Sequence, residues 1–305
     1  MQRIILLVFL FLVSSALKAA PLKLLDSYPT FAGASVALKD IVGTKPVYLK
    51  FWASWCLDCR HELPSLEKSY QQYHNDIAMF AVNLNINESD DAIRELQQKS
   101  GLTMPIVMDQ NGSIASNFQF VGTPFHVLIN AKGEVVYSTY RDDAKLAYKL
   151  QQLAADKIDS VDPETITHLA KAPQPSKPVA SNNDIVLVYF SAVWCDSYMA
   201  DVDANIASHC INAIHTVDKL YQAHPKMVLQ AYVTHLWTED KDLLDYQQRL
   251  HIPYPVKIDH NNAVFQQYHG TGYPTVIVLK QGKEVARFTD FTDSEKVLTA
   301  LKEYF

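Results

Sequence analysis

Four cysteines are the residues of this 305-residue sequence best suited to chemistry, and two of them stand three positions apart. Cys56 and Cys59 follow an apolar run at residues 46–51 and open a helix-like stretch at residues 60–73. The unpaired amide hydrogens of a helix N-terminus stabilise a thiolate on the first cysteine. The second cysteine, one turn later, is placed to close a disulfide or to resolve a mixed disulfide. The spacing therefore predicts thiol-disulfide exchange.

Two other interpretations of Cys56 and Cys59 stay open. One is half of a structural zinc site, which would need two more ligands at similar spacing, and the neighbouring sequence offers only His61 and His74. The other is a plain structural bridge. The tryptophan before the pair, together with the strand and helix on either side, favours the redox interpretation.

Cys195 also follows an apolar run, residues 185–190, but Tyr198 stands where a resolving cysteine would be. We hypothesise that Cys195 forms a disulfide with Cys210, either as a structural clasp or as a second redox pair with a long spacer. Closing this loop of about 14 residues would add on the order of 3 kcal/mol in the chain-entropy model. The alternatives are a free, buried Cys210 and a soft-metal site for copper that includes His209.

The elements around these cysteines occur twice in the chain. In each copy the expected order is strand, helix, strand, helix, strand, strand, helix. Asp109 and Asp259 are 150 residues apart, as are Pro124 and Pro274, but the motif cysteines are only 139 apart. The second copy therefore holds 11 extra residues between its cysteine and its second strand, and its helix is expected at 211–221. The chain is predicted to contain α/β domains at residues 21–155 and 184–305, joined by a proline-rich, semi-extended linker at 156–183.

Residues 1–20 combine Arg3, a short apolar run and small residues, which is typical of a secretory signal peptide. The cleavage position stays open. An uncleaved membrane anchor is the alternative, although the run is short for a span of about 20 residues. Export would bring the cysteines into an oxidising compartment.

Composition and charge exclude several classes of protein. With 48% hydrophobic and 20% charged residues, the chain is ordinary for a globular protein and is neither a disordered tail nor a fibre. The 27 basic and 33 acidic residues give a net charge of -6 without a basic cluster, so the electrostatic footprint of a nucleic-acid-binding protein is missing.

The segment around the first cysteine pair carries a family resemblance. Residues 52–64, WASWCLDCRHELP, closely resemble the active-site segment of the TlpA/ResA-like exported thiol-disulfide oxidoreductases, which have the thioredoxin fold. The resemblance covers about residues 25–155. It includes Thr123 and Pro124, which resemble the cis-proline loop of that family.

The resemblance implies an α/β fold class with two tandem thioredoxin-like domains, each a central mixed β-sheet flanked by helices. Tyr273 and Pro274 form a second cis-proline-like loop, so the second domain is also expected to be thioredoxin-like, with a degenerate motif at Cys195.

The resemblance also implies roles for the residues of the first motif. Cys56 would attack and Cys59 would resolve. Glu62 would tune the thiol pKa and shuttle a proton, although a solvated acid in the first helical turn is the alternative. The expected substrate-binding residues are Trp55, Thr123 and Pro124.

Two positions depart from the pattern of this fold family. The buried acid that thioredoxin carries on the strand before the motif is replaced by Lys50, and the proline between the cysteines is replaced by Asp58. An acid beside the pair raises the pKa of the nucleophile, whereas an inward-pointing lysine lowers it. The sign of the net effect is left open.

These observations together predict an exported, periplasmic enzyme that reduces disulfides in protein substrates. By resemblance, its electrons would come from a DsbD- or CcdA-like membrane donor. The exchange itself requires no cofactor and no metal, and we expect neither a nucleic-acid partner nor stable membrane insertion after the signal is removed. The second domain would bind substrate or modulate the first. The alternatives are a thioredoxin-like binding module, chaperone or metallochaperone, and a thiol peroxidase that uses Cys195 and Cys210.

Overall fold

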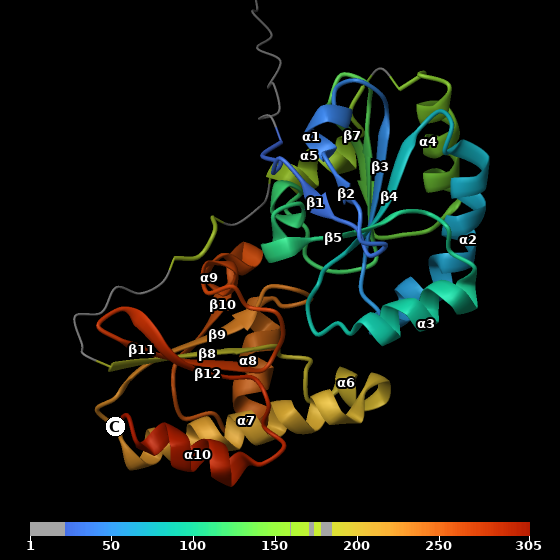
Figure 1. The fold of residues 1–305 in the computed structure, drawn as a ribbon. Helices are drawn as coiled ribbons and strands as arrows, with labels where there is room; N and C mark the ends of the chain where they lie inside the picture. The colour runs from blue at the N-terminus through green and yellow to red at the C-terminus, as the bar shows by residue number, and fades with distance from the viewer. Residues whose placement is uncertain (1–21, 159, 171–173, 178–184) are drawn as a thin grey trace, which may run out of the picture.

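Apolar runs of the sequence form the central strands of two five-stranded sheets in the computed structural model (Figure 1). The structure describes residues 22–158, 160–170, 174–177 and 185–305. The predicted signal peptide at residues 1–20 lies outside the described residues, as do residues 159, 171–173 and 178–183 of the predicted linker. Among the described helices, none combines the length and the apolar character needed to cross a bilayer.

The first unit is built around strand β3 (Val47–Trp52), which is buried at all six positions. The strand order is β5-β4-β3-β6-β7, and β3 runs parallel to β4 and antiparallel to β6, so the sheet is mixed. Helices α2 and α4 lie along one side of this sheet (Figure 1). The elements of this unit are β1 (Tyr28–Pro29), β2 (Ser35–Val36), α1 (Leu38–Ile41), β3, α2 (Leu57–Tyr73), β4 (Ala78–Asn83), α3 (Asp90–Ser100), β5 (Ile106–Met108), the 3-10 turns η1 (Gln110–Gly112) and η2 (Ala115–Asn117), β6 (Phe125–Ile129), β7 (Val135–Thr139) and α4 (Ala144–Ala154).

The second unit repeats this topology around strand β8 (Ile185–Ser191). Its strand order is β10-β9-β8-β11-β12, with β8 parallel to β9 and antiparallel to β11. The prediction of an α/β chain with two tandem mixed sheets flanked by helices is confirmed. The remaining elements are α6 (Tyr198–Val202), α7 (Ala204–Ala223), β9 (Val228–Thr234), α8 (Asp240–Arg249), β10 (Val256–Asp259), η3 (His260–Asn262), α9 (Ala263–Gln267), β11 (Thr275–Lys280), β12 (Lys283–Phe288) and α10 (Ser294–Lys302).

Two stretches differ from the sequence-based expectation. Within the predicted semi-extended linker, Pro163–Ala170 forms helix α5, which begins at a proline whose fixed φ suits the first helical position. Helix α7 begins at Ala204 instead of residue 211, because the side chain of Asp203 caps it by accepting from the amides of Asn205 and Ile206. The insertion of the second copy is therefore largely helical.

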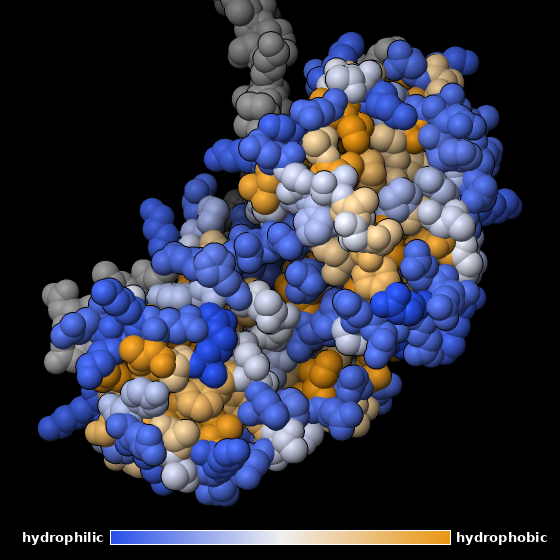
Figure 2. Space-filling view, viewed as in Figure 1, coloured by the Kyte–Doolittle hydropathy of each residue, from blue (hydrophilic) through white to orange (hydrophobic). Residues whose placement is uncertain are grey.

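The apolar core extends across the junction between the two units. One cluster of buried residues includes Trp55 and Cys56 of the first unit together with Cys195, Leu236 and Tyr273 of the second. A separate cluster fills the other face of the second sheet. On the outside, hydrophilic residues cover most of the face shown in Figure 2, and apolar residues gather in smaller groups between them. The two units therefore meet through buried apolar surface.

Candidate active site

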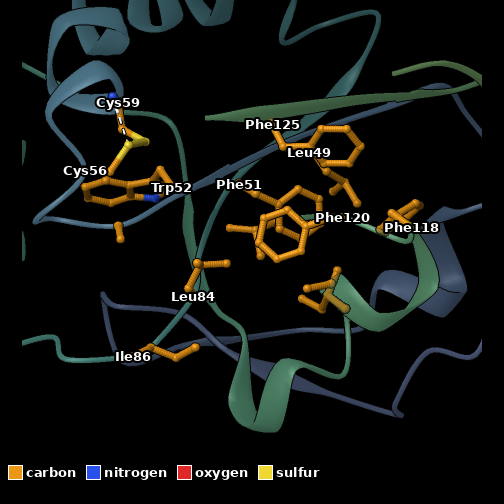
Figure 3. Packing of buried hydrophobic residues seen from close by; sticks show 14 of the residues in the cluster. Leu49, Phe51, Trp52, Cys56, Cys59, Leu84, Ile86, Phe118, Phe120 and Phe125 are labelled. Carbon is orange, nitrogen blue, oxygen red and sulfur yellow. Dashed lines mark hydrogen bonds between the residues drawn. A yellow bond between two sulfur atoms is a disulfide. The ribbon is translucent and has the colours of Figure 1, made fainter. Parts of the chain in front are cut away.

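Cys56 and Cys59 lie where strand β3 gives way to helix α2 (Figure 3). Cys56 is the N-cap residue of α2, and its sulfur accepts a hydrogen bond from the amide of Cys59 at 3.2 Å. The two cysteines are joined by a disulfide with their Cα atoms 5.2 Å apart. Cys56 is only 3% exposed and Cys59 is fully buried. The pair belongs to the same buried cluster as Phe51 and Phe120, whose ring centroids lie 5.4 Å apart.

The loop before strand β6 faces this pair. The peptide bond between Thr123 and Pro124 is cis. Thr123 and Cys56 line the same cavity, which has a volume of about 160 Å³. The hydroxyl of Thr123 is buried without a hydrogen-bond partner among the described residues. Trp55 is buried beside the pair, and its indole nitrogen donates to the carbonyl of Ile86 at 2.7 Å.

A buried polar network lies behind the motif. Lys50 on β3 is fully buried and forms an ion pair with Glu62 on α2. The Nε2 atom of His126 lies 3.2 Å from the Lys50 ammonium and 3.4 Å from the Glu62 carboxylate. The other ring nitrogen of His126 is 2.7 Å from the hydroxyl of Tyr48. Glu62 therefore contacts a buried lysine and a histidine, and is not a freely solvated acid.

Burial controls the charges of this network. Desolvation lowers the pKa of Lys50 to about 7, and the carboxylates of Asp142 and Asp58 oppose that change. Burial, together with the charge of Lys50, holds the pKa of His126 well below its usual value, so the imidazole is neutral. The sequence left the orientation of Lys50 open, and the structure shows that its side chain points inward. Its ammonium group lies behind the cysteine pair, where the Glu62 carboxylate balances its charge.

Sequence reasoning missed Tyr48 and His126. The signal available was Lys50 itself, because a lysine inside an otherwise apolar strand needs a buried partner. The register of β3 against β6, in which Lys50 stands opposite His126, identifies one of those partners, and this register requires the structure.

The second site contains the hypothesised disulfide between Cys195 and Cys210, whose Cα atoms are 6.0 Å apart. Both cysteines are buried, and Cys210 lies within α7. His209 points elsewhere, with its Nε2 atom 3.0 Å from the hydroxyl of Thr292. In the described parts of the chain, no group of three or more histidine, cysteine or acidic side chains is arranged to hold a metal ion.

The cis-proline loops of the two units each bind the other unit. The second loop, like the first, has a cis peptide bond, between Tyr273 and Pro274. The amide of Trp237 donates to the carbonyl of Val121 at 2.7 Å, and the amide of Asn87 donates to the carbonyl of Thr271 at 3.0 Å. The donors of these bonds are 150 residues apart, and so are the acceptors. Each cis-proline loop therefore contacts the equivalent segment of the other unit, and the two contacts are related in a pseudo-symmetric way.

Tryptophans that precede the motif cysteines meet in the middle of this interface. The rings of Trp55 and Trp194 stack with their centroids 5.1 Å apart and an interplanar angle of 28°. Tyr198, which replaces a resolving cysteine in the second motif, reaches across the interface. Its hydroxyl accepts from the amide of Leu57 at 2.9 Å and donates to the carbonyl of Trp55 at 3.2 Å. The second unit thereby covers Cys56.

Comparison with known proteins finds similarity in the first unit. Residues 17–138 match the AhpC/TSA family. The chain is 34% identical over 110 residues to the thioredoxin-like protein YneN of Bacillus subtilis, covering 36% of this chain and 64% of that protein. It is 32% identical over 104 residues to the thiol-disulfide oxidoreductase ResA of Halalkalibacterium halodurans, covering 34% of this chain and 58% of that protein. These matches lie in the first unit, which is therefore similar to thioredoxin-like proteins over the segment that holds the cysteine pair.

The chain spans about three-fifths of the length of these curated relatives, 64% of one and 58% of the other. Among solved structures it is similar to StoA from Bacillus subtilis, with a TM-score of 0.38 and 24% identity, covering 44% of this chain and 98% of that one.

Proposed function

We propose that the protein is an exported thiol-disulfide oxidoreductase that reduces disulfides in protein substrates through Cys56 and Cys59. The observation that carries this proposal is the cysteine pair itself. Cys56 caps the N-terminus of α2 beside a cis-proline loop, and Cys59 is close enough to form the disulfide. The relatives named as a thioredoxin-like protein and a thiol-disulfide oxidoreductase support the same chemistry.

In the proposed reaction the reduced pair donates two electrons to the substrate. The Cys56 thiolate attacks one sulfur of a substrate disulfide, forms a mixed disulfide and releases the other sulfur as a thiolate, which takes a proton from water. The Cys59 thiolate then attacks the Cys56 sulfur and releases the second substrate thiol. This step leaves Cys56 and Cys59 joined by a disulfide, which is the oxidised state seen in the structure.

We assign supporting roles to the residues around the pair. Glu62 would hold and move protons together with Lys50, because the two form an ion pair behind the motif. Thr123 and Pro124 would receive an extended substrate segment, and Trp55 would shape the adjoining surface. A DsbD- or CcdA-like membrane protein would return the electrons in the periplasm, as the resemblance implies.

The second unit would modulate access to Cys56. Its Trp237 is hydrogen-bonded to Val121, two residues before Thr123, and Tyr198 covers the start of α2. A protein substrate that needs the cis-proline loop must therefore displace these contacts. The Cys195 to Cys210 disulfide would fix the region that carries Tyr198.

The deciding experiment is the reduction potential of the Cys56 and Cys59 pair, equilibrated against dithiothreitol and glutathione and measured by thiol labelling and mass. A value near about -270 mV supports a reductase, whereas a value near about -120 mV identifies an oxidase and overturns the proposed direction. A Cys59→Ser variant should trap substrate at Cys56 as a mixed disulfide. A Cys56→Ser variant should trap none.

A further inference from the structure

The cavity beside Cys56 is formed by both units. Its volume is about 160 Å³, about five times the roughly 30 Å³ that one water molecule occupies in the liquid, so it accepts a short side chain and no folded segment. Because Cys56 is otherwise covered, a group bound here lies next to the sulfur that would attack a substrate. The cavity is lined by Cys56, Asp58 and Thr123 of the first unit and by Trp194, Tyr198 and Trp237 of the second.

Aromatic rings form the wall that the second unit contributes. The ring of Trp194 is nearly perpendicular to that of Trp237, at 85° with centroids 5.6 Å apart. It is also nearly perpendicular to the ring of Tyr198, at 87° and 6.3 Å. Trp194 also stacks on Trp55, so the wall joins rings whose faces and edges are turned in different directions. The negative faces of such rings attract ammonium and guanidinium groups.

Asp58 is the one charged side chain in the lining. It is exposed, and among the described residues it takes part in no ion pair. No lysine, arginine or histidine lines the cavity. The cavity thus combines aromatic walls with a single negative charge, which favours a cation over a neutral group and disfavours an anion.

We propose that this cavity selects disulfides that carry a positive charge close to the reacting sulfur, such as a lysine or arginine neighbour of a cysteine, or an aminoethyl group. The proposal rests on the function proposed above, because it specifies the substrates of the same cysteine pair. It also gives the second unit a direct part in recognition, since three of the six lining residues belong to it.

A small-molecule pair tests the charge preference. Cystamine and bis(2-hydroxyethyl) disulfide have the same two-carbon arms and differ in carrying an ammonium or a hydroxyl group. The full chain, reduced beforehand and freed of reductant, is mixed with each disulfide in a single turnover. The Cys56 thiolate attacks one sulfur and releases one thiol, and Cys59 releases the second. Oxidation of the pair is followed by thiol labelling, and each rate is divided by the rate of dithiothreitol with the same disulfide.

We expect the normalised rate with cystamine to exceed that with the hydroxyethyl disulfide by about tenfold, as a partly desolvated cation–π contact and one carboxylate allow. Asp58→Asn and Trp237→Leu should each reduce this ratio by about threefold or more. The ratio is the readout because a change in the pKa of Cys56 alters both rates together. Asp76 is an exposed acid outside the cavity. Asp76→Asn changes the net charge of the protein by the same amount as Asp58→Asn and should leave the ratio unchanged.

The outcomes separate this inference from the proposed function. If both disulfides oxidise the pair at equal normalised rates, or if Asp58→Asn and Asp76→Asn give the same ratio as the unchanged chain, the cavity does not select cations, although the oxidoreductase proposal stands. If neither disulfide oxidises the reduced pair, the proposed function itself fails.

Discussion

At the scale of single residues, the ion pair between Lys50 and Glu62 is the most consequential contact behind the cysteine motif. Lys50 is fully buried, so its removal leaves the Glu62 carboxylate next to a neutral histidine without a cation. We expect Lys50→Met to lower the free energy of unfolding by about 3 kcal/mol, because one partner of a buried pair then remains uncompensated. The double variant Lys50→Met, Glu62→Leu should recover most of that loss.

Urea unfolding of the two single variants and the double variant measures this coupling. Losses that simply add in the double variant would show that the two charges do not depend on each other in the folded state. The Glu62→Leu variant also reports on the proposed proton transfer, because the pH dependence of disulfide exchange should change with it.

Asp109 gives a pH prediction at the same scale. It is buried and accepts hydrogen bonds from the amides of Ile114 and Ala115, and burial raises its pKa to about 7. Between pH 4 and pH 7 the folded state therefore holds a proton that the unfolded chain has released, so stability present below pH 4 is lost as the pH rises through 7. We expect the free energy of unfolding to fall across this window by up to about 1.4 kcal/mol per pH unit for this group.

Unfolding by urea at several pH values checks the Asp109 prediction. Asp109→Asn should flatten the fall between pH 4 and pH 7, whereas Asp76→Asn should keep it. Asp259 in the second unit occupies the corresponding position with a pKa raised by burial to about 6, so part of the slope should remain in the Asp109 variant. A slope identical in the unchanged chain and the Asp109 variant would contradict the assignment.

At the scale of elements, the sequence pattern predicted the central strands and their order well. The run at residues 46–51 became β3, and the repeat predicted a second sheet with the same topology. Helix α5 was missed because the prolines around it resemble a linker, although Asp162 before Pro163 is itself a helix-start signal. The start of α7 was missed because the cap at Asp203 is a side-chain contact and not part of an apolar pattern.

The start of helix α5 covers the edge of the first sheet. The hydroxyl of Thr165 accepts from the amide of Ser138 on edge strand β7 at 2.8 Å, and the amide of Asp162 donates to the carbonyl of Val136 at 2.9 Å. Thr165 is fully buried. We expect Thr165→Val, which keeps the shape and removes the acceptor, to lower the free energy of unfolding by about 1 to 3 kcal/mol.

Chemical denaturation tests the contact, and Thr139→Val on strand β7 provides the comparison, since it removes an acceptor for an amide of its own segment, that of Arg141, and no hydrogen bond to α5 among the described residues. If Thr165→Val leaves the free energy of unfolding unchanged, α5 does not contribute to the stability of the first unit. A larger cost for Thr165→Val would place part of the predicted linker, residues 156–183, within the first folded domain.

At the scale of the whole molecule, the motifs predicted the Cys56 and Cys59 pair and both cis-proline loops, but they did not indicate that the two units cover each other. The contacts that do so join residues far apart in sequence, such as the Tyr198 hydroxyl and the Leu57 amide, 141 positions away. The periodicity of apolar residues along the sequence does not predict contacts of this kind between the two units. The constant offset of 150 residues did identify equivalent positions, and the structure reveals that Asn87 and Trp237 make equivalent bonds across the interface.

We expect these contacts to make Tyr198 a control point for the reactivity of Cys56. Tyr198→Phe removes an acceptor for the Leu57 amide and a donor to the Trp55 carbonyl, which should weaken the contact between the units by about 1 to 2 kcal/mol. If opening of the interface limits access, alkylation of reduced Cys56 by iodoacetamide should accelerate by about five- to thirtyfold, since 1.4 kcal/mol corresponds to a factor of ten. Peptide mass spectrometry measures this rate, and Tyr148→Phe, which is 58% exposed on α4, should leave it unchanged. Equal alkylation rates in both variants would mean that the cavity already admits reagents to the closed molecule, and the second unit would then act in recognition and not in gating.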